Sequence, residues 1–551
     1  MNPEKKIRTL LPFLVGVSIA LGIFIGNKYS NSGVSVVTGR MNKLDAVLAY
    51  INKSYVDTVD MRELIEDALP KILQELDPHS SYISAQEMKR VSEELEGHFS
   101  GIGVSFYVLK DTIVVTSIVP GGPSEAAGIK QWDRIVNVND TCVANIEIAN
   151  ADILKKLRGE KGSEVKLGLK RDGESDLIDI TVTRGDIPVN SVQVSFMQTE
   201  DIGYIKVGTF GFNTFNEFIS ALSKLKSQGA KSFIVDLRGN SGGSLEVVIA
   251  MVNEFLNKGD LIVYADGRSF PREDDYANGS GTCKNDDIVV MIDELSASAS
   301  EIFAGAIQDH DRGLVVGRRS FGKGLVQSQR LLTDGSAVRL TVARYYTPSG
   351  RSIQRKYEKG KHDEYEMEAI NRYMKGDYSD VDSVSGLTPF STLSGRTVYG
   401  GDGIMPDIFM PRDTVGINSY YRSLANNDFI QEYAMLYSDL NRNKLSEFST
   451  YEELADFLQK QPLLINLVSY ADNNGIRPRP YYIQQSKKLF EEQLVSYIVR
   501  NFFGEEGFYP VFLQGDSQFI KSVELINLGM ASPGSVRDKI YNGQNVAEAG
   551  I

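Results

Sequence analysis

A run of small residues before a helical pattern, followed by a lysine between two glycines, most constrains what this chain can be. The segment 296–302 reads S-A-S-A-S-E-I, and the segment 320–327 reads S-F-G-K-G-L-V-Q. Ser298 and Lys323 are hard to explain by structure alone, since both are polar residues among small neighbours. A serine hydroxyl needs an adjacent base to act as a nucleophile, and a desolvated lysine can be that base. We interpret the pair as nucleophile and base.

A lysine acts as a base only when it is neutral, which requires a pKa lowered by apolar surroundings. Phe321 and Leu325 can provide such surroundings, and the glycines beside the lysine let the backbone turn its ammonium inward. Spacing alone also allows a tight turn with a solvated lysine. Of the four histidines, only His310 lies near Ser298 in sequence, and its place before a turn predicts a helix-end residue.

Four segments together resemble the C-terminal processing, or tail-specific, serine peptidases. They are D-L-R-G-N-S-G-G at 236–243, the segments around Ser298 and Lys323, and A-R-Y-Y-T-P-S-G-R-S-I-Q at 343–354. The spacing between the serine and the lysine also matches that family, and the resemblance spans residues 42–411. It implies an α/β Ser-Lys peptidase core that uses no cofactor.

The resemblance implies roles at single positions. Ser298 corresponds to the nucleophile, Lys323 to the general base and Gln327 to the residue that orients the lysine. Gln327 lies four residues after Lys323, so the two share a face both in a helix and in an alternating strand. Asp309, at the end of the helix after the serine, matches a position where the family often carries an aspartate with a supporting role.

A glycine turn and the start of a helix supply candidates for an oxyanion hole. The turn after Asp236 contains no G-K-[ST] phosphate motif. We therefore expect the N–H groups of Gly242 and Gly243, with that of Ala299, to stabilise the oxyanion. The same turn also serves as a tight strand-to-helix connection. The positive end of the helix that begins at Ser298 favours the developing negative charge.

Length and composition indicate a globular protein of several domains. The chain has 551 residues, too many for one core, with 42% hydrophobic and 24% charged residues. A net charge of −13 argues against nucleic-acid binding. Cys142 and Cys283 form no paired motif with each other or with the histidines, which predicts lone thiols and no metal site.

Residues 1–30 predict a signal anchor or a signal peptide. Lys5, Lys6 and Arg8 precede an apolar run at 9–26, about 18 residues or ~27 Å as a helix, which is near the thickness of a bilayer core. Only a poor small-x-small cleavage site follows, so we expect the segment to be retained as an anchor. The basic flank then puts the rest of the chain on the periplasmic side of the cytoplasmic membrane.

Residues 41–95 predict two or three helices. Ser84 and Glu87 have the spacing of a capping box, which marks the start of one of them. The phrase L-D-P-H-S-S-Y-I-S at 76–84 is also typical of the resembled family. We expect its histidine, His79, to be a structural cap.

From about residue 99 the apolar period changes to two, and residues 96–185 resemble a PDZ domain. Such a domain adds a peptide C-terminus to a sheet edge and holds the terminal carboxylate with backbone N–H groups of a glycine loop. Here that loop consists of Gly101, Ile102 and Gly103. A small β domain without a ligand is the alternative, and the contacts of Trp132 stay open.

The peptidase core is expected at 186–411, where strand, helix and strand in that order predict crossover connections. A charged, tyrosine-rich insertion with disordered stretches is expected at about 355–398. Residues 412–551 show helical periodicity and no recognisable chemistry, which predicts an accessory extension for dimerisation, adaptor docking or gating. The fold class is therefore α/β and multidomain, with N-terminal helices, a PDZ-like β domain before the core and a mainly helical C-terminal extension.

Together these features predict an exported, membrane-anchored serine endopeptidase with a Ser-Lys dyad that processes or degrades proteins through their C-terminal tails. No cofactor, metal or nucleic acid is implied. The alternative from another class is a tail-binding scaffold with a silent or adaptor-dependent core, and a third is a carrier of an apolar ligand. Intact Ser298, Lys323 and Gln327 argue against a dead core. The sequence leaves open whether the chain forms homo-oligomers or needs an activating partner.

Overall fold

The computed structural model describes residues 43–375 and 386–535, so the predicted anchor at 9–26 lies outside the described part. Among the described helices, none is both long and apolar enough to cross a bilayer. The chain divides into two compact units: Met1–Leu73 and Gln74–Ile551. In its described part, the first unit holds two helices, the second of which ends at the boundary: α2 (Lys43–Ser54) and α3 (Met61–Gln74).

The second unit begins with a turn, the short strand β1 (Ser81–Ile83) and the helix α4 (Ala85–Glu96). The predicted capping box starts α4. The Ser84 side chain accepts from the N–H of Glu87, and the Glu87 carboxylate accepts from the N–H of Ser84. A left-handed glycine then ends the helix and leads into the next domain.

The PDZ-like β domain follows as predicted. Its sheet has the order β3-β4-β5-β7-β8, with β6 paired to β5. β3 pairs only with β4 within the described residues, so its other edge is open to an added strand. The chain enters and leaves this domain through the antiparallel pair β2 and β9. The elements in chain order are β2 (His98–Gly101), β3 (Val104–Leu109), β4 (Thr112–Ile118), α5 (Pro123–Ala126), β5 (Arg134–Val138), β6 (Thr141–Cys142), α6 (Asn150–Leu157), β7 (Glu164–Lys170), β8 (Ile178–Thr183) and β9 (Gly185–Pro188).

The α/β core is built on a six-stranded sheet of order β10-β11-β12-β15-β16-β21. All neighbours are parallel except β10 and β11. Central parallel strands are covered on both faces, which explains their continuous apolar runs. The strands are β10 (Val192–Met197), β11 (Ile202–Val207), β12 (Ser232–Asp236), β15 (Asp287–Ile292), β16 (Leu314–Gly317) and β21 (Ile408–Phe409).

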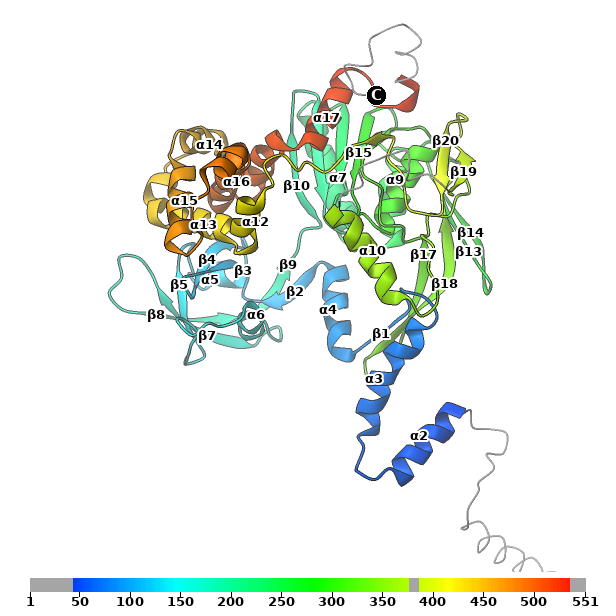
Figure 1. Ribbon diagram of the computed structural model, residues 1–551, viewed down its shortest axis with the longest axis horizontal. Coiled ribbons are helices and arrows are strands. Elements are labelled where there is room, and N and C mark those ends of the chain that lie inside the picture. The colour runs from blue at the N-terminus through cyan, green and yellow to red at the C-terminus, as the bar shows by residue number, and fades with distance from the viewer. Residues whose placement is uncertain (1–42, 376–385, 536–551) are drawn as a thin grey trace, which may run out of the picture. The chain divides into compact units, whose positions relative to one another are not determined.

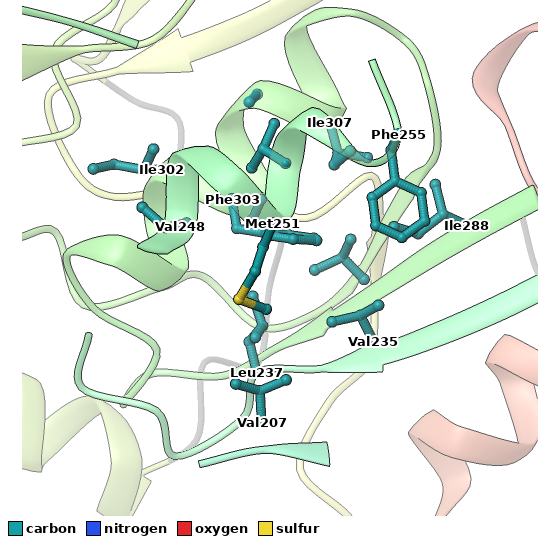
Figure 2. Packing of buried hydrophobic residues seen from close by; sticks show 14 of the residues in the cluster. Val207, Val235, Leu237, Val248, Met251, Phe255, Ile288, Ile302, Phe303 and Ile307 are labelled. Atoms are coloured by element: carbon teal, nitrogen blue, oxygen red, sulfur yellow. The ribbon is translucent and has the colours of Figure 1, made fainter. Parts of the chain in front are cut away.

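Three crossover helices cover one face of this sheet: α7 (Thr214–Ser227), α8 (Leu245–Asn253) and α9 (Ala299–Asp309). Figure 2 shows the packing between the strands and α8 and α9, where Val235 and Ile288 meet Phe255, Met251 and Phe303. Every residue of α9 is buried. The serine turn is therefore anchored to a rigid layer of the core.

The opposite face of the sheet is covered by the end of the chain. The helix α17 (Ser517–Asn527) packs on β12, β15 and β16, preceded by the short helix η1 (Leu513–Gly515) (Figure 1). The Phe519 ring lies edge-on to Tyr204 of β11, with ring centroids 5.3 Å apart. The segment expected as an accessory extension thus includes a layer of the peptidase core, which sequence periodicity could not indicate.

The remaining tail helices form a separate cluster with its own apolar core. Its α13 contacts β3 and its α16 contacts β4 of the PDZ-like domain (Figure 1). Trp132 packs against Phe502 at 5.5 Å between ring centroids, and Arg134 pairs with Asp439 at 2.5 Å. Trp132 therefore contacts the tail. The helices are α12 (Ser419–Asn426), α13 (Phe429–Leu445), α14 (Tyr451–Gln459), α15 (Leu463–Asn473) and α16 (Pro480–Phe512).

A second, antiparallel sheet has the order β1-β18-β13-β14, with β17 also paired to β18. The expected insertion follows it. A helix and a hairpin form on either side of residues 376–385, which lie outside the described part, so the disordered stretches expected within 355–398 stay a prediction. The elements are β13 (Leu261–Gly267), β14 (Phe270–Tyr276), β17 (Leu325–Leu331), β18 (Ala337–Tyr346), α10 (His362–Lys375), β19 (Thr388–Ser391) and β20 (Thr397–Gly400).

We predict that Phe519→Ala destabilises the core by about 3–5 kcal/mol, because it leaves a cavity between α17 and the sheet. Phe519 is 3% exposed, whereas its neighbour Ile520 is 48% exposed. Ile520→Ala is therefore the matched control and should change stability by less than about 1 kcal/mol. The urea midpoint of unfolding measures both. Equal midpoints for the two variants would show that α17 is not a layer of the core.

Candidate active site

Ser298 lies in a strained turn between β15 and α9. Its φ is 55° and its ψ is −112°, outside the region that a residue with a side chain normally adopts. Such a conformation costs on the order of 1–3 kcal/mol and persists only where the surroundings fix it. Ser298 is partly exposed, although its neighbours on both sides are buried. The turn therefore presents the hydroxyl at the N-terminus of α9, where the helix dipole favours negative charge.

The glycine turn after β12 lies directly against the serine. A side-chain carbon at Gly242 would be 2.8 Å from Cβ of Ser298 and 3.2 Å from the backbone nitrogen of Ala299, so only glycine fits. The N–H of Gly242 donates to Oδ1 of Asn240 at 2.9 Å. This bond removes Gly242 from the three expected oxyanion donors. The N–H groups of Gly243 and Ala299 make no hydrogen bond within the described residues and stay available.

Glu301 joins the serine turn to the lysine loop. Its Oε2 accepts from the backbone N–H of Ser298 and of Lys323, both at 2.8 Å. Its Oε1 accepts from the N–H of Gly322 at 2.7 Å and from Oγ of Ser320 at 2.5 Å. The carboxyl is fully buried, and burial raises its pKa while the four donors oppose the shift. The backbones that carry the predicted nucleophile and base are thus close neighbours.

Sequence reasoning missed Glu301 as a site residue. The signal that could have found it is the S-x-x-E spacing from Ser298, which is that of a capping box. In the structure the carboxylate does accept from the first residue of that box, but most of its donors come from residues 320–323. Those contacts depend on tertiary structure.

Lys323 is partly buried in the loop that leads into β17, between the buried Gly322 and Gly324. Burial lowers the pKa of its ammonium, and the positive charge of Arg339 lowers it further, while the Glu301 and Asp77 carboxylates raise it. The net direction is toward the neutral amine. Within the described residues, its side-chain nitrogen has no hydrogen-bond or salt-bridge partner. The partial burial in this loop therefore favours the neutral amine that a lysine base needs.

Gln327 has a different hydrogen-bond partner from the expected one. Its Nε2 donates to the backbone carbonyl of His79 at 2.5 Å, and no hydrogen bond joins it to Lys323 in the described part of the chain. The expectation that Gln327 orients Lys323 directly stays a prediction. In the structure, the Gln327 side chain instead joins β17 by this hydrogen bond to the turn that precedes β1.

That turn is capped by Asp77, in contrast to the expectation for His79. The Asp77 carboxylate accepts from the N–H of His79 at 2.9 Å, and from the N–H and hydroxyl of Ser80 at 2.8 and 2.6 Å. It also accepts from Oγ1 of Thr341 in β18. The His79 ring takes no part in this cap, and its Nε2 lies 3.1 Å from the hydroxyl of Tyr365. His79 therefore packs beside Phe321 and Tyr365, close enough for the charge of Lys323 to affect its imidazole.

Asp309 lies at the far end of α9 from Ser298. Its Oδ1 accepts from Arg351 at 2.8 Å, and both side chains are fully buried. Its Oδ2 accepts from the N–H of Ser349 at 3.0 Å. The contacts connect α9 to the turn after β18, so Asp309 supports the fold of the site and does not contact the reacting groups.

The predicted carboxylate loop of the PDZ-like domain has two backbone N–H groups without an acceptor in the described chain. The carbonyls of Ile102 and Gly103 accept from the N–H groups of Ser124 and Val119, both at 3.0 Å. The N–H groups of Ile102 and Gly103 donate to no group in the described chain. Gly103 has a φ of 78°, which favours glycine. The loop, which begins at Gly101, adjoins the open edge of β3.

The described residues contain no group of three or more metal-ligating side chains. The two cysteines are free, as expected from their separation, with Cys142 exposed and Cys283 buried.

We predict that His79 makes the protein sensitive to acid. Burial, followed by the nearby Lys323 charge, lowers its pKa to about 3, whereas the unfolded value is about 6.5. Between these values the unfolded state binds more protons, so the free energy of unfolding falls as pH decreases from about 6.5 toward 3. His79→Asn should flatten this dependence by up to about 1.4 kcal/mol per pH unit.

The measurement is urea unfolding of both proteins at several values between about pH 7 and about pH 4. Other titrating groups contribute equally to both, so the difference between the two curves isolates His79. Parallel curves would show that its imidazole titrates normally in the folded protein.

Three family models match this chain. Peptidase family S41 matches residues 201–364, a PDZ domain matches 100–182, and a family of unknown function matches 420–504. The first match contains both the serine turn and the lysine loop, and the last lies in the tail helices.

Curated relatives match over most of their length. The chain is 34% identical over 360 residues to the carboxy-terminal processing protease CtpA of Bacillus subtilis, which covers 65% of this chain and 76% of that protein. It is 33% identical over 357 residues to a carboxy-terminal-processing protease of Bartonella bacilliformis, a match that covers 63% of this chain and 80% of that protein. Among solved structures, the photosystem II D1 C-terminal processing protease is 28% identical, covers 56% of this chain and 89% of that chain, and has a TM-score of 0.32. The chain therefore belongs to peptidase family S41, in its group of carboxy-terminal processing serine proteases.

Proposed function

We propose that the chain is a serine endopeptidase in which Ser298 is the nucleophile and Lys323 the general base. The observation that carries this proposal is the shared carboxylate of Glu301, which holds the two backbones together by hydrogen bonds of 2.8 Å each. The lowered pKa of the partly buried lysine supports its role as a base. The partly exposed, strained position of the serine supports its role as a nucleophile.

The reaction then follows the ordinary course of acyl transfer. Neutral Lys323 takes the proton as Oγ of Ser298 attacks the scissile carbonyl carbon, and the N–H groups of Gly243 and Ala299 stabilise the oxyanion. The lysine ammonium gives its proton to the leaving amine, which leaves an acyl-enzyme. Water activated by the same lysine hydrolyses the ester and restores the serine.

The substrate is proposed to be a protein with a free C-terminal tail. The open edge of β3 and the unpaired N–H groups of Ile102 and Gly103 support binding of a terminal carboxylate. Action outside the cytoplasmic membrane is supported by the basic flank and the apolar run at 9–26. The tail-binding scaffold with a silent core is less favoured, because the chain has both predicted catalytic side chains on neighbouring backbones.

We predict that Ser298→Ala and Lys323→Met each reduce cleavage of an unstructured protein by at least about 10³-fold. Methionine keeps the length and apolar stem of lysine, so packing changes little while the base is lost. Lys231→Ala, at an exposed lysine of the same core, should leave the rate unchanged. The measurement is kcat/KM by mass spectrometry of the products, from about pH 6 to about pH 10.

In the wild type, kcat/KM should rise through an apparent pKa below the ordinary lysine value of about 10.4. Cleavage that survives Ser298→Ala would refute the nucleophile. A silent wild type that still binds a tail would favour the adaptor-dependent scaffold.

We also predict that tail recognition depends on the terminal carboxylate. A substrate with an amidated C-terminus loses the anion that the carboxylate loop holds, so its KM should rise by about tenfold or more with kcat nearly unchanged. Gly103→Ala should have the same effect on the free-acid substrate, because the new methyl group would lie 2.9 Å from Cδ1 of Ile187. Lys166→Ala, at an exposed site of the same domain, is the control. Equal KM values for acid and amide would exclude carboxylate recognition.

A further inference from the structure

The insertion helix α10 has no place in the proposed reaction, yet it carries two buried polar side chains. Tyr365 is 6% exposed and Arg372 is 8% exposed, although most of the surrounding residues of the helix are exposed. The two lie seven residues apart and thus share one face of the helix, about two turns from each other. Buried polar groups need partners, and the partners here belong to the lysine loop and its supports.

The Tyr365 hydroxyl connects three segments that are distant in sequence. It lies 3.1 Å from Nε2 of His79, accepts from Nε2 of Gln354 at 3.1 Å, and lies 3.5 Å from the carbonyl oxygen of Gly322. The ring lies edge-on to His79 and Phe321, with centroids 5.4 and 6.2 Å away. A single phenol thus contacts the turn before β1, the irregular segment after β18 and the lysine loop.

Each of these partners holds the backbone near Lys323 in turn. Oε1 of Gln354 accepts from the N–H of Gly324 at 3.0 Å, and the carbonyl of His79 accepts from Gln327. Gly322 and Gly324 flank the lysine directly. The Tyr365 hydroxyl therefore contacts Gly322, before the proposed base, and reaches Gly324, after it, through the side chain of Gln354.

Arg372 attaches the other end of the helix to the same loop. Its guanidinium donates to the carbonyl of Ser320 at 3.2 Å and to that of Phe321 at 3.3 Å. It also pairs with Glu368 on the preceding turn of α10. The helix is thus attached to residues 320–322 at two points, and the Phe321 and Tyr365 rings lie edge-on to each other between these points.

We propose that α10 is a positioning element for the general base, in which the Tyr365 hydroxyl fixes the lysine loop and excludes water from it. This inference rests on the proposed role of Lys323. Glycines on both sides of the lysine give its backbone many accessible conformations, so an outside contact must select one of them. With the contact removed, the loop admits water, and the pKa of the lysine rises toward its ordinary value.

Other charges around the base stay in place when the hydroxyl is removed. Those that face Lys323 are Glu301 of α9, Arg339 of β18 and Asp77 of the turn before β1. Those that face the neighbouring His79 also include Arg355 and His362. None of them gains or loses a charge in Tyr365→Phe. A change in the lysine pKa would therefore report the position and hydration of the loop.

The test compares Tyr365→Phe with Tyr357→Phe in the full chain. The Tyr357 ring is 6.3 Å from that of Tyr365, and its hydroxyl makes no hydrogen bond within the described residues, so it is a matched control. For Tyr365→Phe, kcat/KM at about pH 7 should fall by about five- to tenfold, and the midpoint of the pH profile should move up by about 0.7 to 1 unit. Above the new midpoint the rates of the variant and the wild type should converge. Tyr357→Phe should behave as wild type.

A second measurement does not require catalysis. In the Ser298→Ala background, the pH dependence of acetylation of Lys323 by acetic anhydride, followed by mass spectrometry, gives the lysine pKa directly. It should rise on adding Tyr365→Phe, and also on adding Arg372→Gln, which weakens the second attachment. Urea unfolding confirms that each variant is folded.

The outcomes separate this inference from the function on which it rests. Cleavage that survives Lys323→Met would overturn the base itself. If that variant is silent while Tyr365→Phe keeps the wild-type pH midpoint and lysine pKa, the positioning role of α10 is wrong, whether or not the rate has dropped. A raised midpoint with a raised lysine pKa supports it.

Discussion

The buried carboxylate of Glu301 is the interaction on which the rest of the site depends. Taking an isolated carboxylate out of water costs several kcal/mol, so it must be met by donors. Here four donors meet it, and hydrogen bonds to a charged group contribute about 1.5–3 kcal/mol each. Two of those donors are the backbone N–H groups of Ser298 and Lys323. The loops cannot separate without leaving a buried charge unpaired, and this requirement keeps Ser298 in its strained turn.

This dependence also explains why the core is so rigid around α9. The helix is buried along its whole length between the sheet and the turn held by Asp309 and Arg351. Beneath it the strands alternate their side chains between two apolar layers, one facing α7, α8 and α9 and the other facing α17. A carboxylate at the start of α9 therefore has a fixed position, and it transfers that position to the loop around Lys323. Figure 2 shows how closely α8 and α9 pack on the strands.

The sequence predicts those parts of the site whose signals are local. Ser298 and Lys323 are marked by their small neighbours, the helix and strand pattern predicts the α/β core, and Ser84 with Glu87 predicts the start of α4. Contacts between distant segments leave no such mark. Nothing near Tyr365 in the sequence indicates that it meets His79, 286 positions earlier. For the same reason the tail reads as a separate helical segment, although Phe519 covers Tyr204 in the sheet. The sequence also could not show that the N–H of Gly242 is used by Asn240, because that hydrogen bond depends on the exact bend of the turn.

The tail also determines how the PDZ-like domain can be used. The residues of β3 and β4 that face its helices include Tyr107, Leu109 and Val114, whereas the core of the domain takes the alternate side chains. The helices α13 and α16 therefore pack on the sheet face that is turned away from the domain's own core. The hydroxyl of Tyr107 donates to Asp428 at 2.9 Å, which fixes the end of α13 there. A peptide added to β3 would instead lie along the strand edge, next to the carboxylate loop. Because a strand uses its face and its edge for different contacts, the tail can hold the domain without occupying the place of the peptide.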